Sequence, residues 1–224
     1  MSNRLGIIIP TYMEERWLPG CLDSLGDATV PVLVADGGST DATLTVAAAH
    51  RLQPQVLQVT GGRHRQLNDA LEQIVADWVL IMPADGRLLP GAIERISYAC
   101  SHLPSAAACL TMTPDDRAWP HRLRGAWSAL RSRLTGGAYL DQAPLFHRGA
   151  ALAVGGFRAC GSYDSADLGW RLRAHGRFVV VSEPVIMSCR EYHQRGFLGA
   201  TLRHQRLRWR QFRRAAPAEN FGRS

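Results

Sequence analysis

Residues 30–41 of the chain read VPVLVADGGSTD, an apolar run that ends in an acid, two glycines and a cluster of Ser, Thr and Asp. The β-branched run Val30–Ala35 predicts a buried strand closed by turn residues. Asp36 then stands at the carboxyl end of that strand, the edge where open α/β sheets bind their ligands. Gly37 and Gly38 allow a sharp turn and a close approach of the backbone. An ordinary strand-turn-helix junction would look the same, so this stretch alone leaves both readings open.

Similar units flank this stretch on both sides. A β-branched strand is predicted at Arg4–Pro10, and helical spacing of apolar residues from Trp17 to Leu25 follows it. After the opening strand we expect a helix at Thr40–Leu52, a strand at Gln55–Thr60, a helix that begins at the paired glycines 61–62, and a strand at Asp77–Met82. Three β-α units with short connections predict an α/β fold with a mainly parallel, doubly wound sheet and helices on both faces.

The second half of the chain is less regular. The segment Pro114–Gly137 is basic and is expected to be an acceptor-side insert or lid, helical around Trp119–Leu134. The chain is further expected to form, in order, a helix at Gly91–Leu103, strands at Ala106–Met112 and Tyr139–Arg148, a turn at 155–157, a helix at Ser165–His175, strands at Arg177–Val181 and Val185–Ser188, and a helix at Phe197–Arg214.

The composition is that of an ordinary globular chain of 224 residues, with 46% hydrophobic and 20% charged residues. No window approaches the ~18 uncharged apolar residues that a membrane span needs. The apolar run Leu5–Pro10 is too short for the core of a signal peptide, so we expect a cytoplasmic protein. Five cysteines form no CxxC pair, and we expect reduced core residues rather than disulfides or metal ligands.

The positive charge is concentrated at the C-terminus. From Arg190 to the end there are nine Arg against Glu191 and Glu219, a balance of +7 that equals the formal charge of the whole chain. Every one of the 26 basic residues is Arg, so part of this is compositional bias. No nucleic-acid-binding module is present, and we expect no nucleic-acid partner.

Several motifs follow one another in a pattern that resembles family 2 glycosyltransferases of the GT-A fold. In order they are PTYMEERWL, VADGGSTDAT, GGRHRQLNDAL, IMPADGRLLPGA, LDQAPLFHRGAALAVGGF and DSADLGWRLRAHGR. The chain is most similar to small bacterial members that carry an LHADT metal motif and a GDQ before the GGF turn. The resemblance covers residues 4–192, with 1–90 as the expected nucleotide-binding half, 91–192 as the acceptor half, and 193–224 as a basic amphipathic helix and tail.

The resemblance implies a set of residues for the nucleotide sugar. Thr11 and Glu14 would line the base and ribose, and Asp36 would accept an N–H of the base. Arg65 and Asn68 would hold the diphosphate at a helix start, although solvated helix charges would look alike. The implied set is Pro10, Thr11, Glu14, Asp36, Arg65, Asn68, Ala84 and Asp85. Met13 departs from the family pattern, in which Asn is frequent.

A divalent ion, Mn²⁺ or Mg²⁺, is implied at Asp85, which matches the last acid of the DxD-type site. Pro83 stands where the family has its first acid or a His. A hard cation needs oxygen ligands, and the phosphates of the nucleotide can supply much of its shell. One protein carboxylate therefore suffices for a site that forms together with the substrate.

The catalytic base is expected at Asp164 or Asp167. Inverting transfer needs a carboxylate that takes the proton of the acceptor hydroxyl as its oxygen attacks the anomeric carbon. A gapless match to the family puts Ser165 at that position, which leaves Asp164, one residue earlier, and Asp167 on the same helical face. Asp164 is preferred, with a helix N-cap as its plain alternative.

The acceptor side is expected to include Asp141 and Gln142, which match the family's DQ pair, although they could instead satisfy backbone groups. Gln205, Arg208 and Trp209 read as the QxxRW motif of processive family 2 enzymes, with a plain surface helix as the alternative. The same tail could lie on an anionic membrane surface, which would place the protein peripherally at the inner face of the membrane.

The resemblance thus implies a glycosyltransferase that moves a sugar from a UDP- or GDP-linked donor to a small or lipid-linked acceptor. A non-catalytic nucleotide-sugar-binding relative is the alternative, because the metal and base motifs are both weakened. A nucleotidyltransferase on a similar sheet would carry a Gly-rich loop with Lys, and the chain contains no Lys.

Overall fold

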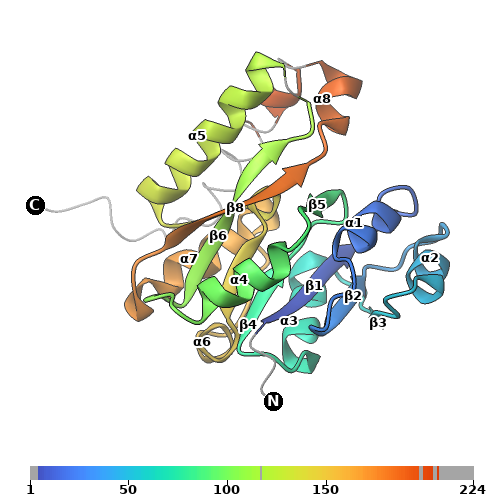
Figure 1. Ribbon diagram of the computed structural model, residues 1–224, viewed down its shortest axis with the longest axis horizontal. Coiled ribbons are helices and arrows are strands. Elements are labelled where there is room, and N and C mark those ends of the chain that lie inside the picture. The colour runs from blue at the N-terminus through green and yellow to red at the C-terminus, as the bar shows by residue number, and fades with distance from the viewer. Residues whose placement is uncertain (1–4, 117, 197–198, 204–205, 207–224) are drawn as a thin grey trace, which may run out of the picture.

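The structure is a computed structural model that describes residues 5–116, 118–196, 199–203 and 206. Within these residues eight strands form a single sheet with helices around it (Figure 1). The strands are β1 (Leu5–Thr11), β2 (Val32–Asp36), β3 (Gln55–Gln58), β4 (Trp78–Ile81), β5 (Gly86–Leu88), β6 (Ala107–Pro114), β7 (Pro144–His147) and β8 (Val179–Met187). The helices are α1 (Leu18–Ser24), α2 (Thr43–Ala49), α3 (Arg63–Gln73), α4 (Ala92–Cys100), α5 (Trp119–Thr135), α6 (Arg148–Ala153), α7 (Asp164–Arg171) and α8 (Arg190–Arg195), with short 3-10 turns η1 (Leu140–Gln142), η2 (Gly161–Tyr163) and η3 (Leu172–His175).

The order of strands across the sheet is β3-β2-β1-β4-β7-β6-β8-β5. The first four are parallel, as the repeated β-α units predict. β7 runs antiparallel between β4 and β6, β8 runs parallel to β6, and β5 closes the far edge antiparallel to β8. The expected α/β fold with a mainly parallel sheet is confirmed, and one sheet runs through both expected halves of the chain.

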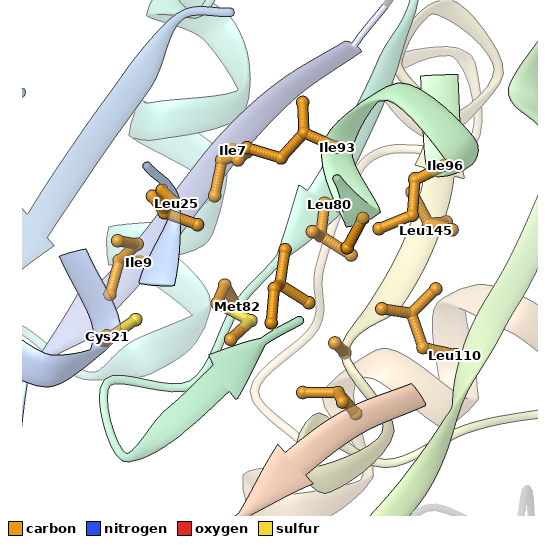
Figure 2. Packing of buried hydrophobic residues seen from close by; sticks show 14 of the residues in the cluster. Ile7, Ile9, Cys21, Leu25, Leu80, Met82, Ile93, Ile96, Leu110 and Leu145 are labelled. Atoms are coloured by element: carbon orange, nitrogen blue, oxygen red, sulfur yellow. The ribbon is translucent and has the colours of Figure 1, made fainter. Parts of the chain in front are cut away.

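Two apolar cores lie on opposite faces of the sheet because successive side chains of a strand point to opposite sides. In β1, Ile7 and Ile9 join the core beneath α1 and α4, whereas Ile8 joins the core beneath α3. Figure 2 shows the first of these cores, where Ile7, Ile9 and Leu80 pack against side chains of the neighbouring helices. Fully buried side chains on both faces explain why the strands read as continuous apolar runs.

The register of β1 and β2 brings their carboxyl ends level, with Thr11 beside Asp36. β3 continues the row with Gln58 beside Asp36, and Met82, just after β4, donates its backbone N–H to Ile8 O at 2.8 Å. The turns that follow β1, β2 and β4 therefore leave the sheet at one edge, where the first motifs of the chain meet.

Three expectations for the second half were wrong in detail. The two strands expected at Arg177–Val181 and Val185–Ser188 are one strand, β8, whose register with β6 shifts between Cys109 and Thr111. Pro184, which has no N–H to donate, lies at this irregularity. The third is the expected strand Tyr139–Arg148, which begins only at Pro144 because residues 140–142 form η1.

Three short elements were not predicted from the sequence. β5 has three residues shortly after β4, α6 has six residues directly after β7, and α8 has six residues after β8. Elements this short carry too few residues for a hydrophobic period to be visible. The helix expected at Phe197–Arg214 falls largely on residues outside the described part of the chain.

The cysteines are free thiols, four of them buried and Cys160 partly exposed. The four buried thiols agree with the expectation of reduced core residues, and Cys160 departs from it. In the part of the chain that the structure describes, no helix has both the length and the apolar character that a membrane span requires.

Candidate active site

A cavity of about 600 Å³ lies at the carboxyl edge of the parallel strands. The turn after β1 contributes Pro10, Thr11, Tyr12 and Glu14; the turn after β2 contributes Gly37; the start of α3 contributes Gly62, Arg63 and Gln66; the turn after β4 contributes Pro83, Ala84 and Asp85; and Leu140 and Arg190 complete the lining. Pro10, Thr11, Glu14, Ala84 and Asp85, all named from the sequence, are thus brought together here. A cavity of this size and position suits a ligand as large as a nucleotide sugar.

Asp36, which was expected to accept an N–H of the base, is not among the residues that line this cavity, and it lies buried behind them. Its carboxylate is fully buried and accepts hydrogen bonds from Thr11 Oγ1 at 3.0 Å, the backbone N–H of Gly38 at 2.9 Å, and the N–H and hydroxyl of Ser39 at 2.8 and 2.5 Å. Ser39 Oγ in turn accepts from the N–H of Met13 at 2.9 Å. Asp36 therefore ties the turn after β1 to the turn after β2.

Gly37 lies where a side chain has no room. A Cβ at this position would be 2.9 Å from Gln66 Nε2 and 3.3 Å from Thr11 O. Gln66 donates to Thr11 O at 2.8 Å and to Ala35 O at 2.9 Å, so α3 docks directly on the ends of β1 and β2. The glycine serves close packing of the backbone against the helix.

Arg190 bridges two acids at the far side of the cavity. Its two terminal nitrogens each donate to one oxygen of Glu14 at 2.8 Å, and its Nε lies 3.1 Å from Asp85 Oδ2. The guanidinium also lies over Trp17, 5.2 Å from the ring centroid. The start of α8 is thereby fixed to the turns after β1 and β4 by a bidentate ion pair.

Burial raises the pKa of Asp85 above its ordinary value, and the neighbouring Glu14 adds to this effect. Arg190 opposes it by stabilising the carboxylate. The net shift of the pKa is upward because the desolvation of the carboxylate has a larger effect than the stabilisation that the Arg190 guanidinium provides. Asp85 therefore keeps its proton to a higher pH than an exposed Asp would.

Asp164 lies behind Arg63 instead of at the cavity surface. Its side chain is almost completely buried, and Oδ2 accepts from Arg63 Nε at 2.7 Å. Arg63 also donates to Gly161 O at 2.7 Å, and Ser165 N–H donates to Asp164 Oδ1 at 2.7 Å. The structure thus brings Asp164 next to the nucleotide pocket through a guanidinium that itself lines the cavity.

Asp167 belongs to a second, separate ion pair. Its carboxylate accepts from Arg171 Nε at 2.8 Å, one helical turn away in α7. Arg171 also donates to the backbone carbonyls of Val154 and Gly156, which belong to the turn after α6. Asp167 therefore helps to hold α7 against the GGF turn.

Asn68 makes a comparable contact from α3, and Arg65 does not line the cavity. Asn68 Nδ2 donates to Phe157 O at 2.9 Å and its Oδ1 accepts from Phe157 N–H at 2.7 Å. Arg65 is exposed and lies against Gly61. The residues of α3 that reach the cavity are Arg63, two residues before Arg65, and Gln66, which lies between Arg65 and Asn68 in the chain.

A smaller cavity of about 220 Å³ adjoins the first and shares Pro83, Asp85, Leu140 and Arg190 with it. Its other lining residues are Arg124, Asp141, Met187, Ser188 and Tyr192. Two of them carry buried polar atoms for which the described residues provide no hydrogen-bond partner: Asp141 Oδ1 and Arg124 Nε. The side chains of Arg124, Asp141 and Ser188 in its lining suit a polar ligand next to the first cavity.

Gln142 holds η1 in the position that this cavity requires. Its amide oxygen accepts from Ser132 Oγ at 2.8 Å and from Arg131 at 3.0 Å, and its nitrogen donates to the carbonyl of Ser128 at 3.4 Å. Gln142 is fully buried and so cannot touch an acceptor itself. Of the DQ pair, Asp141 is the residue that reaches the cavity.

The oxygen ligands suit a divalent ion in kind but are few. Asp85 and Glu14 present carboxylates to the cavity, and Asp141 adds a buried oxygen without a hydrogen bond. Among the described residues, no three His, Cys, Asp or Glu side chains come close enough together to hold a metal ion. An ion at Asp85 would fit only with phosphate oxygens completing its shell.

The sequence missed Arg63, Gln66, Arg124, Arg190 and Tyr192. A signal existed for Arg63, the first residue of α3 after the paired glycines, where a guanidinium and helix N–H groups can meet an anion. The sequence contains no local signal for Arg190, because its partner Glu14 lies 176 residues away in the chain. Gln205, Arg208 and Trp209 lie outside the described residues.

An α/β sheet with a nucleotide-sized cavity at its carboxyl edge defines a nucleotide-binding class of protein. A family model described as glycosyl transferase family 2 matches residues 6–160. The chain belongs to this family, as its motifs had indicated.

Among curated proteins, the chain is 33% identical over 139 residues to N-acetylglucosaminyl-diphospho-decaprenol L-rhamnosyltransferase of Mycobacterium tuberculosis, which covers 54% of this chain and 45% of that protein. It is also 33% identical over 92 residues to the poly(ribitol-phosphate) beta-N-acetylglucosaminyltransferase TarS of Staphylococcus aureus, over 37% of this chain and 16% of that protein. The chain spans less than half the length of these curated relatives.

Solved structures show the same fold. The mannosyltransferase PcManGT from Pyrobaculum calidifontis, in complex with GDP-Man and Mn²⁺, has a TM-score of 0.74 at 19% identity, over 95% of this chain and 64% of that one. TarS residues 1–349 of S. aureus in complex with UDP-GlcNAc has a TM-score of 0.66 at 19% identity, over 83% and 58%. The expected GT-A fold is confirmed.

Proposed function

We propose that the chain transfers a sugar from a nucleotide diphosphate sugar to an acceptor hydroxyl. The observation that carries the proposal is the cavity at the carboxyl edge of the sheet, where Thr11, Glu14, Arg63, Asp85 and Arg190 converge in a chain of glycosyl transferase family 2. Structural neighbours bound to UDP-GlcNAc and GDP-Man support a UDP- or GDP-linked donor.

The donor would lie across the turns that follow the strands. Thr11, Glu14 and the turn held by Asp36 form the nucleoside end of the cavity, and Arg63 stands at the start of α3, where an anionic diphosphate is favoured by the N-terminal amides and by the guanidinium. Arg65 is exposed near the same helix start, within reach of a longer ligand, while Asn68 fixes the turn behind it.

A divalent ion, Mn²⁺ or Mg²⁺, would be held by Asp85 together with oxygens of the diphosphate. Arg190 would have to release Asp85 for this, and its bidentate pair with Glu14 would keep it at the site. When bound, the ion would offset the charge of the departing diphosphate. The Mn²⁺ present in the PcManGT complex supports the choice of ion.

Three carboxylates are candidates for the group that takes the proton of the acceptor hydroxyl. Asp164 and Asp167, expected from the family pattern, are each engaged by an arginine. Asp141 lines the adjoining cavity, and among the described residues no arginine forms an ion pair with it, in contrast to Asp164 and Asp167. The geometry favours Asp141 as the base, with Asp164 positioning Arg63 and Asp167 positioning Arg171.

The acceptor would enter the smaller cavity, where Arg124 suits an anionic group close to the reacting hydroxyl. A lipid-linked acceptor carries such a group, and the decaprenol-linked acceptor in the name of the mycobacterial relative supports this class. A small anionic acceptor has the same chemistry. We place the protein in the cytoplasm, peripherally at the inner face of the membrane, and infer inversion at the anomeric carbon from the family to which the chain belongs.

The test is a thermal-shift panel of UDP-, GDP- and dTDP-sugars with and without Mn²⁺, followed by donor hydrolysis with the best ligand. A donor that binds the folded protein raises its melting temperature. Hydrolysis by the parent, with loss in Asp85→Ala, supports the enzyme. Binding without hydrolysis across the panel supports the alternative, a non-catalytic nucleotide-sugar-binding relative. Absence of both binding and hydrolysis would overturn the proposal.

A further inference from the structure

Helix α5 is turned with its bulky apolar side chains toward solvent. Five large residues at spacings of four, four, three and four form one stripe along it, and each is at least 46% exposed. They are Trp119 (72%), Leu123 (59%), Trp127 (57%), Leu130 (46%) and Leu134 (74%). A surface helix of a globular protein normally turns such a stripe toward the core.

The opposite face of α5 is small and polar, and its contacts fix this orientation. Gly125 packs so closely on β6 that a Cβ there would lie 2.9 Å from Met112 O. Ser132 donates to the buried Gln142 at 2.8 Å, and the carbonyl of Ser128 accepts from the same residue. Rotating the helix to bury the stripe would break these bonds and would force large side chains against the sheet, so the exposed stripe is a property of the fold.

The stripe is long and lies at the edge of the molecule. It spans sixteen residues of helix, or about 23 Å at 1.5 Å per residue. Figure 1 shows α5 at one end of the view, beside α8 and the ends of β6 and β8. A contiguous apolar surface of this kind is rare on a soluble monomer and marks a site of interaction.

The charges of the same helix identify the partner. Between residues 119 and 135 the sequence has four Arg and no acidic residue. Arg133 is exposed in the last turn, whereas Arg124 and Arg131 are partly buried and make contacts on the inner side of the helix. A cationic helix with Trp and Leu on one face suits the interface of an anionic bilayer, where Trp rings sit at the level of the headgroups. A second copy of the chain would instead bring two such helices together, and neither has an acidic residue between positions 119 and 135 to pair with Arg133 of the other.

We propose that the exposed face of α5 formed by Trp119, Leu123, Trp127, Leu130 and Leu134 binds to an anionic membrane surface. This extends the proposed function, since Arg124 on the same helix lines the smaller cavity proposed for the acceptor. Membrane binding through α5 would bring that cavity to the headgroup region. The surface itself does not depend on the chemistry, because none of its five side chains lines either cavity.

The experiment is flotation of the full chain with vesicles of phosphatidylcholine alone and of phosphatidylcholine with phosphatidylglycerol. The parent should float with the anionic vesicles. The double variant Leu123→Ser/Trp127→Ser should bind them about tenfold more weakly or worse, because two large apolar side chains no longer leave water. The matched control is Val75→Ser/Tyr98→Ser, which removes two residues that are 77% and 70% exposed elsewhere and should bind like the parent.

Two further measurements keep the outcome unambiguous. The thermal shift with the nucleotide sugar should be the same for the parent and for both double variants. Loss of membrane binding and loss of donor binding therefore give different results. Light scattering of the parent should give a monomer. The proposal would be overturned if the parent did not bind anionic vesicles, or if the Leu123→Ser/Trp127→Ser variant bound them as well as the control does. It would also be overturned if the parent were a dimer and this variant a monomer.

Discussion

Both terminal nitrogens of Arg190 donate to the carboxylate of Glu14 at 2.8 Å, although 176 residues separate the two in the chain. Glu14 lies in the turn after the first strand and Arg190 begins the helix after the last strand. The Nε of the same guanidinium reaches Asp85 at 3.1 Å. This cluster connects the turn after β1 to the start of α8, and two of its members, Asp85 and Arg190, line both cavities.

Arg190→Ala should destabilise the protein by about 1–3 kcal/mol. Removing the guanidinium leaves two largely buried carboxylates facing one another, although partial exposure of Arg190 (31%) keeps the effect below that of a fully buried pair. Urea denaturation measures the loss. The matched control is Arg51→Ala, which breaks an exposed pair with Asp27 and should change stability by less than about 0.5 kcal/mol. Equal effects of the two substitutions would contradict the assignment.

Asp85→Asn should stabilise the protein relative to the parent at neutral pH. Burial raises the pKa of Asp85 in the folded state, so the folded protein holds this proton more tightly than the unfolded chain. The parent therefore loses stability as the pH rises from the ordinary value of 3.8 through the raised pKa, and the variant does not. Denaturation of both proteins from about pH 4 to about pH 8 should show the advantage of the variant growing and then levelling off. An advantage that shrinks with rising pH would refute the shift.

Asp141→Asn should lower kcat by about 10²–10⁴-fold, the usual contribution of a general base, with little change in donor binding. Asp164→Asn should act differently, because it releases Arg63 from its ion pair at 2.7 Å and so weakens the binding of the donor. Transfer kinetics together with donor titration separate the two effects. If Asp164→Asn lowered kcat alone and Asp141→Asn left it unchanged, the base would be Asp164.

Gly37→Ala should cost about 1–3 kcal/mol, because its Cβ would meet Gln66 Nε2 at 2.9 Å and force α3 away from the strand ends. Gly20→Ala is the control. Gly20 lies in α1 with its nearest neighbour 4.0 Å from a Cβ, so alanine there should raise stability by about 0.5–1 kcal/mol. Thermal unfolding of the two variants should move in opposite directions, and a shared direction would argue against the close packing.

Met13→Asn should stabilise the protein by about 0.5–1 kcal/mol. Met13 has a φ of +57°, in the left-handed region that Asn adopts more easily than other residues with a side chain. Its backbone N–H, which donates to Ser39, is unaffected by the change. Chemical denaturation checks the gain. A loss of stability would mean that the contact of the Met13 sulfur with Thr40 outweighs the strain.

The strand ends were predictable because each involves neighbouring residues. Thr11, Asp36 and Asp85 each follow an apolar run, and parallel strands place such positions at one edge of the sheet. The acceptor side was predictable only in part. Asp141 reaches a cavity, but its neighbour Gln142 is buried, and the choice between them depends on how α5 packs over η1.

The sequence by itself determined the parallel half of the sheet, the family and the acids at the strand ends, since hydrophobic period and turn residues are local properties. Only the tertiary structure decided that Arg190 pairs with Glu14, that Arg63 covers Asp164, and that α5 turns its Trp and Leu residues outward. These features join residues far apart in the chain, and their geometry follows from packing, which no single segment encodes.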